Sequence, residues 1–374
     1  MRITSIECIP VGWPVEGELR WGRMAVRRKG APLIRVTTDE GVEGIGEAGF
    51  SIEFFRSVSV IVEGILTPAL LGENPLDVER LWRKMVELTH LWGRRGMETY
   101  AVSGVEIALW DIVGKVAGLP IHRLLGTYQE SVPAYAAPSL RPPDEVGRDC
   151  ERAVQRGFRA VKLRTGLDPE TDVEIVRIAR CTVGDGVALM VDGNSAYDLP
   201  TAVRLASRFG EYGIEFLEEP LKTSSLPAYI HDHKELAGRI SIPLAGGECL
   251  FTHWEFAELV GSRAFAVVQP DCTGSGGIGV VKKIGAMADA AGLRCIPHIA
   301  CSSGTGVGFA AALQVIASLP NCPWIEYDAY EDPVGAKLLK EGFSLVDGKV
   351  HVPMRPGLGL EIDEERLKTL RLDR

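Results

Sequence analysis

The sequence has no excess of basic residues and no long apolar run. Its 374 residues include 41 Lys and Arg against 50 Asp and Glu, a formal net charge of −9. Binding to nucleic acid usually relies on a basic surface, so we expect no nucleic-acid partner. A membrane-spanning helix needs roughly 18 consecutive apolar residues. The chain has no such run, and its N-terminus lacks a basic start followed by an apolar core, so we expect no membrane partner either.

The eight cysteines show no CxxC spacing and lie mostly among apolar residues. A disulfide or zinc framework would show a regular spacing. Cys249 and Cys272 stand next to two of the motifs described below, but neither has a partner at metal-ligand spacing. We expect these cysteines to be reduced thiols that serve packing, and we therefore expect a cytoplasmic location.

The length of the chain predicts two domains, because 374 residues exceed one ordinary domain. The first part has strand-like and then helical segments, as in an α+β domain: strands at 3–12, 31–39 and 41–49, and helices near 53–70, 76–92 and 98–117. We expect a capping domain over residues 1–128 and a main domain over 129–345. The final segment, 346–374, is expected to return to the cap.

Eight short apolar segments recur in the main domain. One lies near 132–138, and the other seven close on a polar residue at intervals of 23 to 30 residues, about one strand, one helix and two loops: Lys162, Asp192, Glu218, Glu248, Asp271, His298 and Glu326. Amphipathic stretches separate them, as after Pro143, where Val146, Cys150 and Ala153 follow helical spacing. The pattern predicts an α/β fold of the (β/α)8-barrel type, with the active site at the carboxyl ends of the strands.

Three successive strands of this predicted barrel end in the carboxylates Asp192, Glu218 and Glu248. Taken singly, each is better explained as a helix cap or a solvated charge. Together they would converge on one small volume, where their mutual repulsion is tolerable only if a cation neutralises them. An all-oxygen ligand set favours Mg²⁺ over Zn²⁺, which prefers His or Cys. We therefore predict a magnesium site on these three residues.

Asp271 and His298 end the next two predicted strands. A carboxylate that accepts from one imidazole nitrogen fixes the tautomer and makes the other nitrogen a better base. We expect His298 to be a general base with Asp271 as its partner; the alternative is a histidine held by an ordinary core hydrogen bond. His231 and His233 lie in a polar helical segment and are expected to be exposed.

Lys162 and Arg164 close another predicted strand, and strand alternation points both to the same side. They would face the carboxylates across the barrel; the alternative is a pair of solvated surface cations. Glu326 ends the last predicted strand. It would orient or donate to a substrate oxygen, unless it caps a helix or lies on the surface.

This ordered set of motifs resembles the enolase superfamily, and within it the mandelate racemase subgroup. The matching motifs are Lys162-x-Arg164, Asp192 with Asn194, Glu218-Glu219-Pro220, Gly247-Glu248, Gln269-Pro270-Asp271, Pro297-His298 and Glu326. The resemblance covers nearly the whole chain, including the segment GVEGIGEAG at 41–49. It implies an enolase-like, modified TIM barrel with an N-terminal cap and abstraction of a proton next to a carboxylate, with Mg²⁺ stabilising the enediolate that forms.

Residue by residue, the resemblance implies Mg²⁺ on the three carboxylates, Asp271 and His298 as the acid/base pair, and Lys162 holding the substrate carboxylate. One position departs from the racemase pattern, which has a second lysine base where this chain has Arg164. Arginine is always protonated in proteins and is a poor base. Racemisation needs two bases, whereas elimination of water proceeds with one, so we expect an acid-sugar dehydratase. The alternatives in the same subgroup are a sugar-lactone cycloisomerase and a hydroxy-acid racemase or epimerase.

Substrate identity is expected to depend on two cap loops, near 13–30 and 49–56. Together with Asn194, we expect Arg20, Trp21 and Arg23 to bind the distal part of a sugar acid or diacid, although these arginines are equally explained as solvated loop charges. The resemblance further implies a homo-oligomer, between a dimer and an octamer.

Two functions of other classes compete with this hypothesis. A non-catalytic barrel that kept only its metal site is possible on fold grounds. The full set of metal ligands, base and partner argues against it. A hydrolytic metalloenzyme would usually want nitrogen ligands and a metal-bound water, which the Asp and Glu set does not supply.

Overall fold

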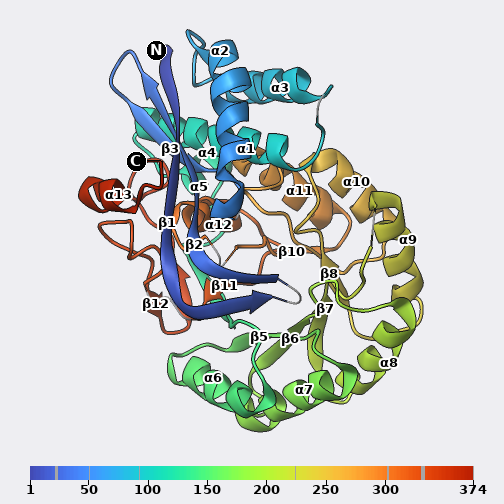
Figure 1. The fold of residues 1–374 in the computed structure, drawn as a ribbon. Coiled ribbons are helices and arrows are strands. Elements are labelled where there is room, and N and C mark those ends of the chain that lie inside the picture. The colour runs from blue at the N-terminus through green and yellow to red at the C-terminus, as the bar shows by residue number, and fades with distance from the viewer. Residues whose placement is uncertain are drawn as a thin grey trace.

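The structure is a computed structural model that describes residues 1–21, 24–49, 51–91, 93–223, 225–300, 303–329 and 333–373. The N-terminal sheet and its helices form a cap that lies against a larger α/β barrel, shown in green to orange in Figure 1. The predicted fold class, an α/β barrel with an N-terminal α+β cap, is confirmed. The division of the chain at residues 128 and 345 stays a prediction.

The cap sheet is antiparallel and has the order β1 (Ile3–Trp21), β2 (Met24–Thr38) and β3 (Glu43–Glu47). Its first hairpin is longer than predicted, because β1 and β2 stay paired through most of the segment 13–30 that we expected to be a loop. The pairing register shifts between Pro14 and Leu19, so the chain absorbs Pro14 and Gly17 as an irregularity instead of ending the strand. The hairpin extends across the mouth of the barrel (Figure 1).

Six helical segments complete the cap: η1 (Ile52–Phe54), α1 (Phe55–Ile61), the π-helical turn η2 (Val62–Leu66), α2 (Thr67–Leu70), α3 (Val78–Thr89) and α4 (Met97–Ala117). Helix α4 packs directly on β3. A Cβ atom at Gly44 would lie 2.1 Å from the carbonyl oxygen of Ala108, and one at Gly46 would lie 2.0 Å from that of Gly104. Only glycine at both positions allows this close approach.

The barrel strands are short and parallel. They are β4 (Ser131–Ala137), β5 (Ala160–Arg164), β6 (Ala188–Asp192), β7 (Ile214–Glu218), β8 (Leu244–Gly246), β9 (Val267–Val268), β10 (Arg294–Cys295) and β11 (Ile325–Asp328). The ladder runs from β4 to β10 in chain order, and β11 pairs with β4. In the described part of the chain no ladder joins β10 to β11. These eight strands correspond to the eight strands predicted from the sequence.

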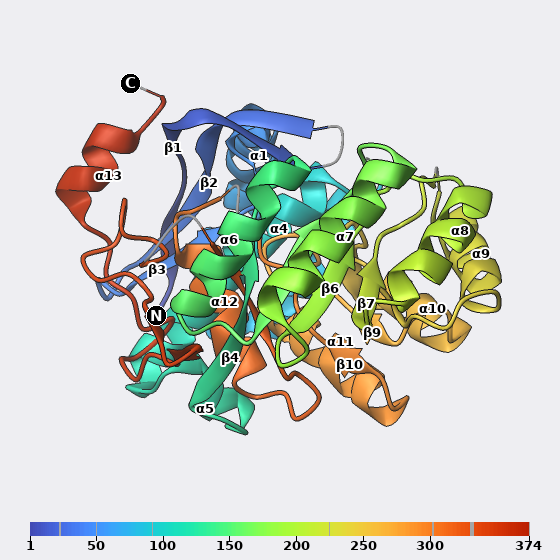
Figure 2. The same ribbon diagram turned by 90° about the horizontal axis from the view of Figure 1, so that it is seen from below.

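Helices cover the outside of the strands, as Figure 2 shows for α6, α7 and α8. Those after β4 are α6 (Pro143–Gln155), α7 (Pro169–Val183), α8 (Leu199–Gly210), α9 (Leu226–Ala237), α10 (Thr252–Ser262), α11 (Ile278–Ala290) and α12 (Val307–Ile316), and α5 (Ile121–Leu125) precedes β4. The loops into α7, α8 and α9 end with Asp168, Asp198 and Ser225, whose side chains accept from the backbone N–H three residues later. No helix within the described ranges has the length and apolar character to cross a membrane.

The barrel interior explains the placement of the functional side chains. Ala160, Met190 and Phe216 belong to a buried cluster inside the barrel, and Lys162, Asp192 and Glu218 follow them by two positions. Residues two apart on a strand point to the same face. The polar residues therefore also point inward, one layer above the apolar plug, at the carboxyl ends of the strands.

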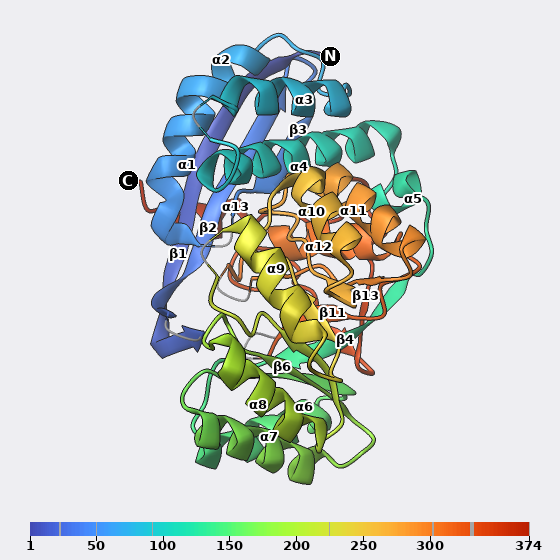
Figure 3. The same cartoon turned by 90° about the vertical axis from the view of Figure 1, so that its right-hand side faces the viewer.

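The end of the chain touches both parts of the molecule. The hairpin of β12 (Leu345–Val346) and β13 (Lys349–His351) pairs with β4 through β13. After α13 (Glu364–Leu370), the backbone N–H of Leu372 donates to the carbonyl of Pro10 on β1 at 3.0 Å. The last residues thus lie against the cap sheet, while α4 of the cap lies across the barrel helices α10 and α11 (Figure 3).

Candidate active site

Five charged side chains meet at the carboxyl ends of β5, β6, β7 and β11. The amino group of Lys162 donates to Glu218 Oε1 at 2.8 Å and lies 3.1 Å from Glu326 Oε1 and 3.8 Å from Asp192 Oδ2. Arg164 Nη1 donates to Asp192 Oδ2 at 2.7 Å. All five side chains are buried, so this is an interior ion-pair network and not a solvated surface.

This network, with Glu248 beside it, carries more negative than positive charge. Burial raises the pKa of Glu218 to about 7; the Lys162 ammonium opposes this rise, while Asp192 and Glu326 add to it. Burial alone would lower the pKa of Lys162, but Glu218, Glu326 and Asp192 raise it well above its usual value. Four carboxylates thus face two cations.

The donor atoms fit a hard divalent cation. Asp192 and Glu218 are paired neighbours in the β6–β7 register. Glu248 lies two residues beyond the end of β8, the next strand of the barrel. All three offer carboxylate oxygens, the ligands that Mg²⁺ prefers. In the part of the chain that is described, no three His, Cys, Asp or Glu side chains are gathered tightly enough to hold a metal. The Lys162 amino group contacts Glu218 and Glu326, and Arg164 contacts Asp192.

Neighbouring polar groups orient these carboxylates. The Gln269 amide donates to Glu218 Oε2 at 2.8 Å, and the Tyr135 hydroxyl donates to Glu326 Oε2 at 3.1 Å. Asn194, predicted to bind substrate, donates from its backbone N–H and side-chain amide to Asp192 and accepts from Arg164. Its observed contacts therefore position the predicted metal ligand.

The two adjacent glutamates of the EEP motif have different environments. Glu219 contacts neither cation; it accepts from the Tyr229 hydroxyl at 2.6 Å and from the Gly247 backbone N–H at 2.8 Å. A Cβ at Gly246 would lie 2.3 Å from that hydroxyl, so the glycine before Gly247 makes room for the pair. Of the two, only Glu218 joins the cation network.

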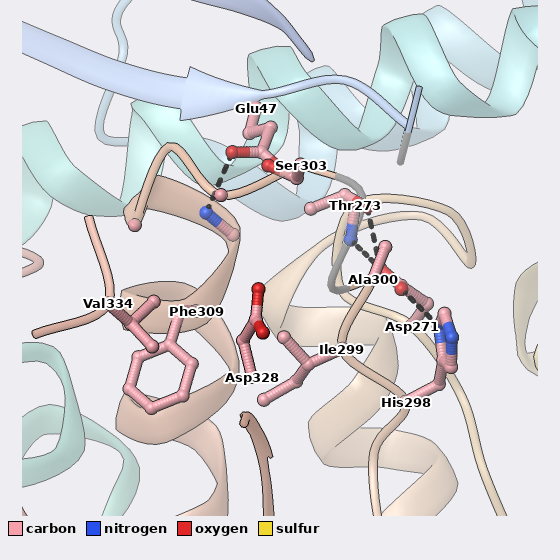
Figure 4. A pocket seen from close by; sticks show the side chains of 13 residues that line it. Glu47, Asp271, Thr273, His298, Ile299, Ala300, Ser303, Phe309, Asp328 and Val334 are labelled. Carbon is pink, nitrogen blue, oxygen red and sulfur yellow. Dashed lines mark hydrogen bonds and ion pairs between the residues drawn. The ribbon is translucent and has the colours of Figure 1, made fainter. Parts of the chain in front are cut away.

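His298 and Asp271 form a directed pair at the ends of β10 and β9 (Figure 4). His298 Nδ1 lies 2.7 Å from Asp271 Oδ2, and His298 Nε2 lies 3.4 Å from Glu248 Oε2. The other oxygen, Asp271 Oδ1, accepts from the backbone N–H and the hydroxyl of Thr273, both at 2.7 Å. Burial would lower the pKa of His298, but Glu248 and Asp271 outweigh it and raise that pKa to about 10.

A cavity begins at His298 and continues beneath the cap; we call it the cap cavity. Its lining includes Glu47, Thr273, His298, Ser303, Phe309 and Asp328. Figure 4 shows the Asp328 carboxylate pointing into it from below and Glu47 facing it from the cap. Its free volume is about 20 Å³, room for roughly one water molecule. A sugar-sized ligand therefore requires the surrounding segments to move.

The cap contributes two buried charges next to this cavity, and neither was singled out from the sequence. Glu47 on β3 accepts from the Ser303 hydroxyl at 2.6 Å, from the Thr305 hydroxyl, and from the Gly308 backbone N–H at 3.1 Å. Burial raises the pKa of Glu47 to about 7 against these hydrogen bonds. Lys29 on β2 forms a buried ion pair with Asp328.

Of the cap residues predicted to bind substrate, the structure describes the side chain of Arg20, and it does not reach the site. The Arg20 side chain is 64% exposed and pairs with Glu18 at 2.7 Å. Its carbonyl accepts from the Leu140 backbone N–H at 2.9 Å, so the hairpin touches the barrel loop after β4. The side chain of Trp21 and the whole of Arg23 lie outside the described residues.

Two predictions of exposure and burial were wrong. His233 is fully buried, its Nδ1 lies 2.8 Å from the Tyr229 carbonyl, and burial lowers its pKa to about 4. Its position on α9 faces inward because Tyr229, one helical turn earlier, is buried beside it. Cys249 is exposed, whereas Cys272 is buried as expected.

Comparisons with known proteins identify the family. The family model "Mandelate racemase / muconate lactonizing enzyme, N-terminal domain" matches residues 3–126, and "Enolase C-terminal domain-like" matches residues 145–366. The chain is 38% identical over 332 residues to an arabinonate dehydratase of Saccharolobus solfataricus, covering 87% of each chain. It is 32% identical over 387 residues to a D-galactarolactone cycloisomerase of Agrobacterium fabrum, covering 100% of this chain and 99% of that protein.

Comparison with solved structures indicates the same family. A racemase from Streptomyces coelicolor A3(2) with bound magnesium matches with a TM-score of 0.90 at 28% identity, covering 99% of this chain and 100% of that one. Enolase superfamily enzymes bind Mg²⁺, and the relatives named above are enzymes that act on acid sugars or their lactones. The chain therefore belongs to the enolase superfamily, as a member of its mandelate racemase and muconate lactonizing enzyme group.

Proposed function

We propose that the protein is a Mg²⁺-dependent dehydratase of acid sugars. Relatives with this activity include the arabinonate dehydratase and a D-xylonate dehydratase of Haloferax volcanii, which is 31% identical over 354 residues. Asp192, Glu218 and Glu248 would hold the ion, which supplies positive charge beside the substrate carboxylate as the α-proton leaves. The excess of carboxylates over cations around Lys162 supports this assignment.

His298 is proposed to take the α-proton. Its Nδ1 is held by Asp271, and its Nε2 lies 3.4 Å from Glu248, the carboxylate that raises the pKa of His298 most. Mg²⁺ on Glu248 would offset that carboxylate and so favour the neutral imidazole, whose Nε2 would serve as the base. The same imidazole then carries a proton that it can return to the departing β-hydroxyl, which leaves as water. Loss of water between C2 and C3 gives an enol that becomes a 2-keto acid.

Lys162 and Arg164 are proposed to act as fixed positive charges. Both are buried among carboxylates at the strand ends, where they would hold the substrate carboxylate and one of its hydroxyl groups. Glu326 contacts Lys162 and Tyr135 and would orient a substrate oxygen. These roles need no second proton transfer.

Elimination is favoured over racemisation by one observation. The site pairs His298 with Asp271, whereas position 164 holds an arginine. Arginine does not give up its proton at the pH where enzymes work, and its carboxylate neighbours raise the pKa of Lys162 well above its usual value. Among the described residues, His298 is therefore the group proposed to abstract the proton. A two-base racemisation lacks its second base.

The test is a screen of acid sugars with Mg²⁺ for 2-keto acid products, run with the wild type and with His298→Asn. The proposal expects one or a few acid sugars to be dehydrated and the variant to be inactive at unchanged thermal stability. A wild type that interconverts two C2 epimers without forming a 2-keto acid would contradict it.

A lactone cycloisomerase is the second candidate, because the cycloisomerase relative matches the whole length of the chain. It would use the same base. Including acid-sugar lactones in the screen separates the two activities, since cycloisomerisation consumes the lactone without releasing water. A homo-oligomer of two to eight chains and a cytoplasmic location remain predictions.

A further inference from the structure

One chain of hydrogen bonds joins the cap to the proposed catalytic base. The backbone N–H of Gly49, two residues beyond the end of β3, donates to the carbonyl of Thr273 at 2.9 Å. Thr273 in turn donates twice to Asp271 Oδ1, and Asp271 Oδ2 lies 2.7 Å from His298 Nδ1. A shift of the end of β3 would therefore reach the imidazole through successive hydrogen bonds.

A second connection starts from Glu47, the last residue of β3. Its carboxylate accepts from the Ser303 and Thr305 hydroxyls and from the Gly308 backbone N–H. These donors belong to the segment that follows His298 and enters helix α12, and Figure 4 shows Ser303 directly beside the Glu47 carboxylate. Glu47 therefore ties the continuation of strand β10 to the cap.

The two connections meet at Gly308, in the first turn of α12. A Cβ atom at this position would lie 2.7 Å from Glu47 Oε1 and 2.8 Å from Thr273 Cγ2. Both distances are too short for a real Cβ contact, so Glu47, Thr273 and the helix pack without space between them. We call Glu47, Thr273 and Gly308 the β3 junction. A movement of one of these residues has to be followed by the other two.

A carboxylate costs more free energy to bury here than an apolar side chain would. Glu47 is buried, and burial raises its pKa to about 7 against its three hydrogen bonds. What a carboxylate adds to a contact is direction, because its two oxygens accept from donors at defined places. Glu47 therefore fits a group that sets the geometry of its donors better than one that only holds the cap on the barrel.

Resting on the proposed function, we propose that Glu47 is a positioning residue for the catalytic base, which fixes the Asp271–His298 pair through the β3 junction. Glu47 itself transfers no proton and does not hold the substrate. The cap then contributes to the rate of proton abstraction. The competing explanations are a proton-transferring role for Glu47 and a contact that serves stability alone.

The experiment compares Glu47→Ala with Glu47→Gln in the presence of Mg²⁺, with arabinonate and D-xylonate as the probes. It measures α-proton exchange in D₂O at saturating probe, KM, and the ¹H–¹⁵N signal of His298 Nδ1. Alanine removes all three hydrogen bonds. Glutamine keeps them, because its carbonyl oxygen can accept from Thr305 and Gly308 while the Ser303 hydroxyl turns to accept from its amide.

We expect Glu47→Ala to slow exchange by about 10²-fold and to change KM by less than about threefold, with the His298 Nδ1 signal shifted. Glu47→Gln should stay within about fivefold of the wild-type rate and keep the wild-type signal. An unchanged signal in Glu47→Ala, or a rise in KM alone, overturns the inference. If glutamine is as slow as alanine, the carboxylate takes part in the chemistry itself and the positioning role is wrong.

Gln314→Ala is the control for a loss of stability alone. Gln314 also lies on α12, six positions beyond Gly308, and accepts from the backbone N–H and the ring Nδ1 of His122, both at 2.8 Å. It should lower the unfolding temperature and leave exchange within about threefold of wild type. A loss of exchange as large as that of Glu47→Ala contradicts the inference.

A milder variant decides if Glu47→Ala does not fold. Thr305→Val keeps the size of the side chain and removes one donor to Glu47, at a residue outside the described lining of the cap cavity. It should shift the His298 signal and slow exchange by about fivefold, and wild-type behaviour in both contradicts the inference. The ring signal is read without substrate, so an unchanged signal overturns the inference alone. A wild type that exchanges the α-proton of no acid sugar in the screen overturns the proposed function.

Discussion

Asp271→Asn tests the proton chemistry at one atom. Asp271 Oδ1 accepts two hydrogen bonds from Thr273, and Oδ2 accepts from His298 Nδ1. An asparagine in this position must keep its oxygen toward the two Thr273 donors. Its amide nitrogen then faces His298, where it can only donate.

The consequence is a change of tautomer. His298 Nδ1 must become an acceptor, which moves the imidazole proton to Nε2, the nitrogen proposed to take the α-proton. Loss of the carboxylate partner of a catalytic histidine costs on the order of 10⁴-fold in kcat. We therefore expect Asp271→Asn to slow α-proton exchange by about 10³ to 10⁴-fold while substrate binding and thermal stability change little.

The assay measures α-proton exchange in D₂O beside the ¹⁵N shifts of the His298 ring. Thr273→Val serves as the comparison, because it removes the hydroxyl donor to Asp271 and keeps the backbone donor. The carboxylate of Asp271 stays in place, so the rate of α-proton exchange should fall only about tenfold. If Asp271→Asn places the ring proton on Nε2 and still exchanges the α-proton within about tenfold of the wild-type rate, the tautomer of His298 does not control proton abstraction.

Three further predictions concern the metal, the domain contact and the pH dependence of stability. Glu218→Gln should weaken Mg²⁺ binding by at least about tenfold in titration calorimetry, and unchanged affinity would exclude Glu218 as a ligand. Glu106→Ala should lower the free energy of unfolding, measured in urea, by about 3 kcal/mol. Glu106 accepts hydrogen bonds from Ile278 N, Gly279 N and Trp110 Nε1, and these donors would lose their partner. The exposed control Glu53→Ala should change the free energy of unfolding by less than about 0.5 kcal/mol. His233 has its folded-state pKa lowered from 6.5 to about 4, so the unfolded chain takes up the proton first and stability falls as pH drops from 6.5 toward 4. By linkage the loss approaches about 3 kcal/mol, and His233→Gln should lack this part of the acid sensitivity; an unchanged pH profile would argue against the buried neutral histidine.

The barrel and its ring of polar residues were predictable because two periodicities coincide. Residues two apart on a strand point to the same face, so Lys162 points inward like Ala160, and Glu218 points inward like Phe216. The strand–helix repeat then brings the ends of successive strands to one face. Both signals are local or regular, so the order of residues is enough to read them.

The cap contacts were not predictable for the opposite reason. Lys29 follows the exposed Arg27 and Arg28, and its partner Asp328 lies 299 positions away. Nothing in the local sequence distinguishes the buried cation from its exposed neighbours. Asp328 did carry a signal, because it follows Glu326 by two positions on the same strand and therefore points to the same face.

The choice between Glu218 and Glu219 depends on a tertiary contact as well. Tyr229 reaches Glu219 from α9, and Gly246 makes room for that contact. The buried His233 was misjudged from the polar residues around it, because a helix buries one face whatever lies on the other.

In the proposed reaction one base, His298, abstracts the proton, and Arg164 takes no part in proton transfer. The most direct measurement is α-proton exchange in D₂O with both C2 epimers of the substrate, under single-turnover conditions and with Mg²⁺ present. We expect the wild type to exchange the α-proton of one epimer only, and His298→Asn to exchange neither. Exchange and inversion of both epimers by the wild type would contradict it and identify a two-base racemase.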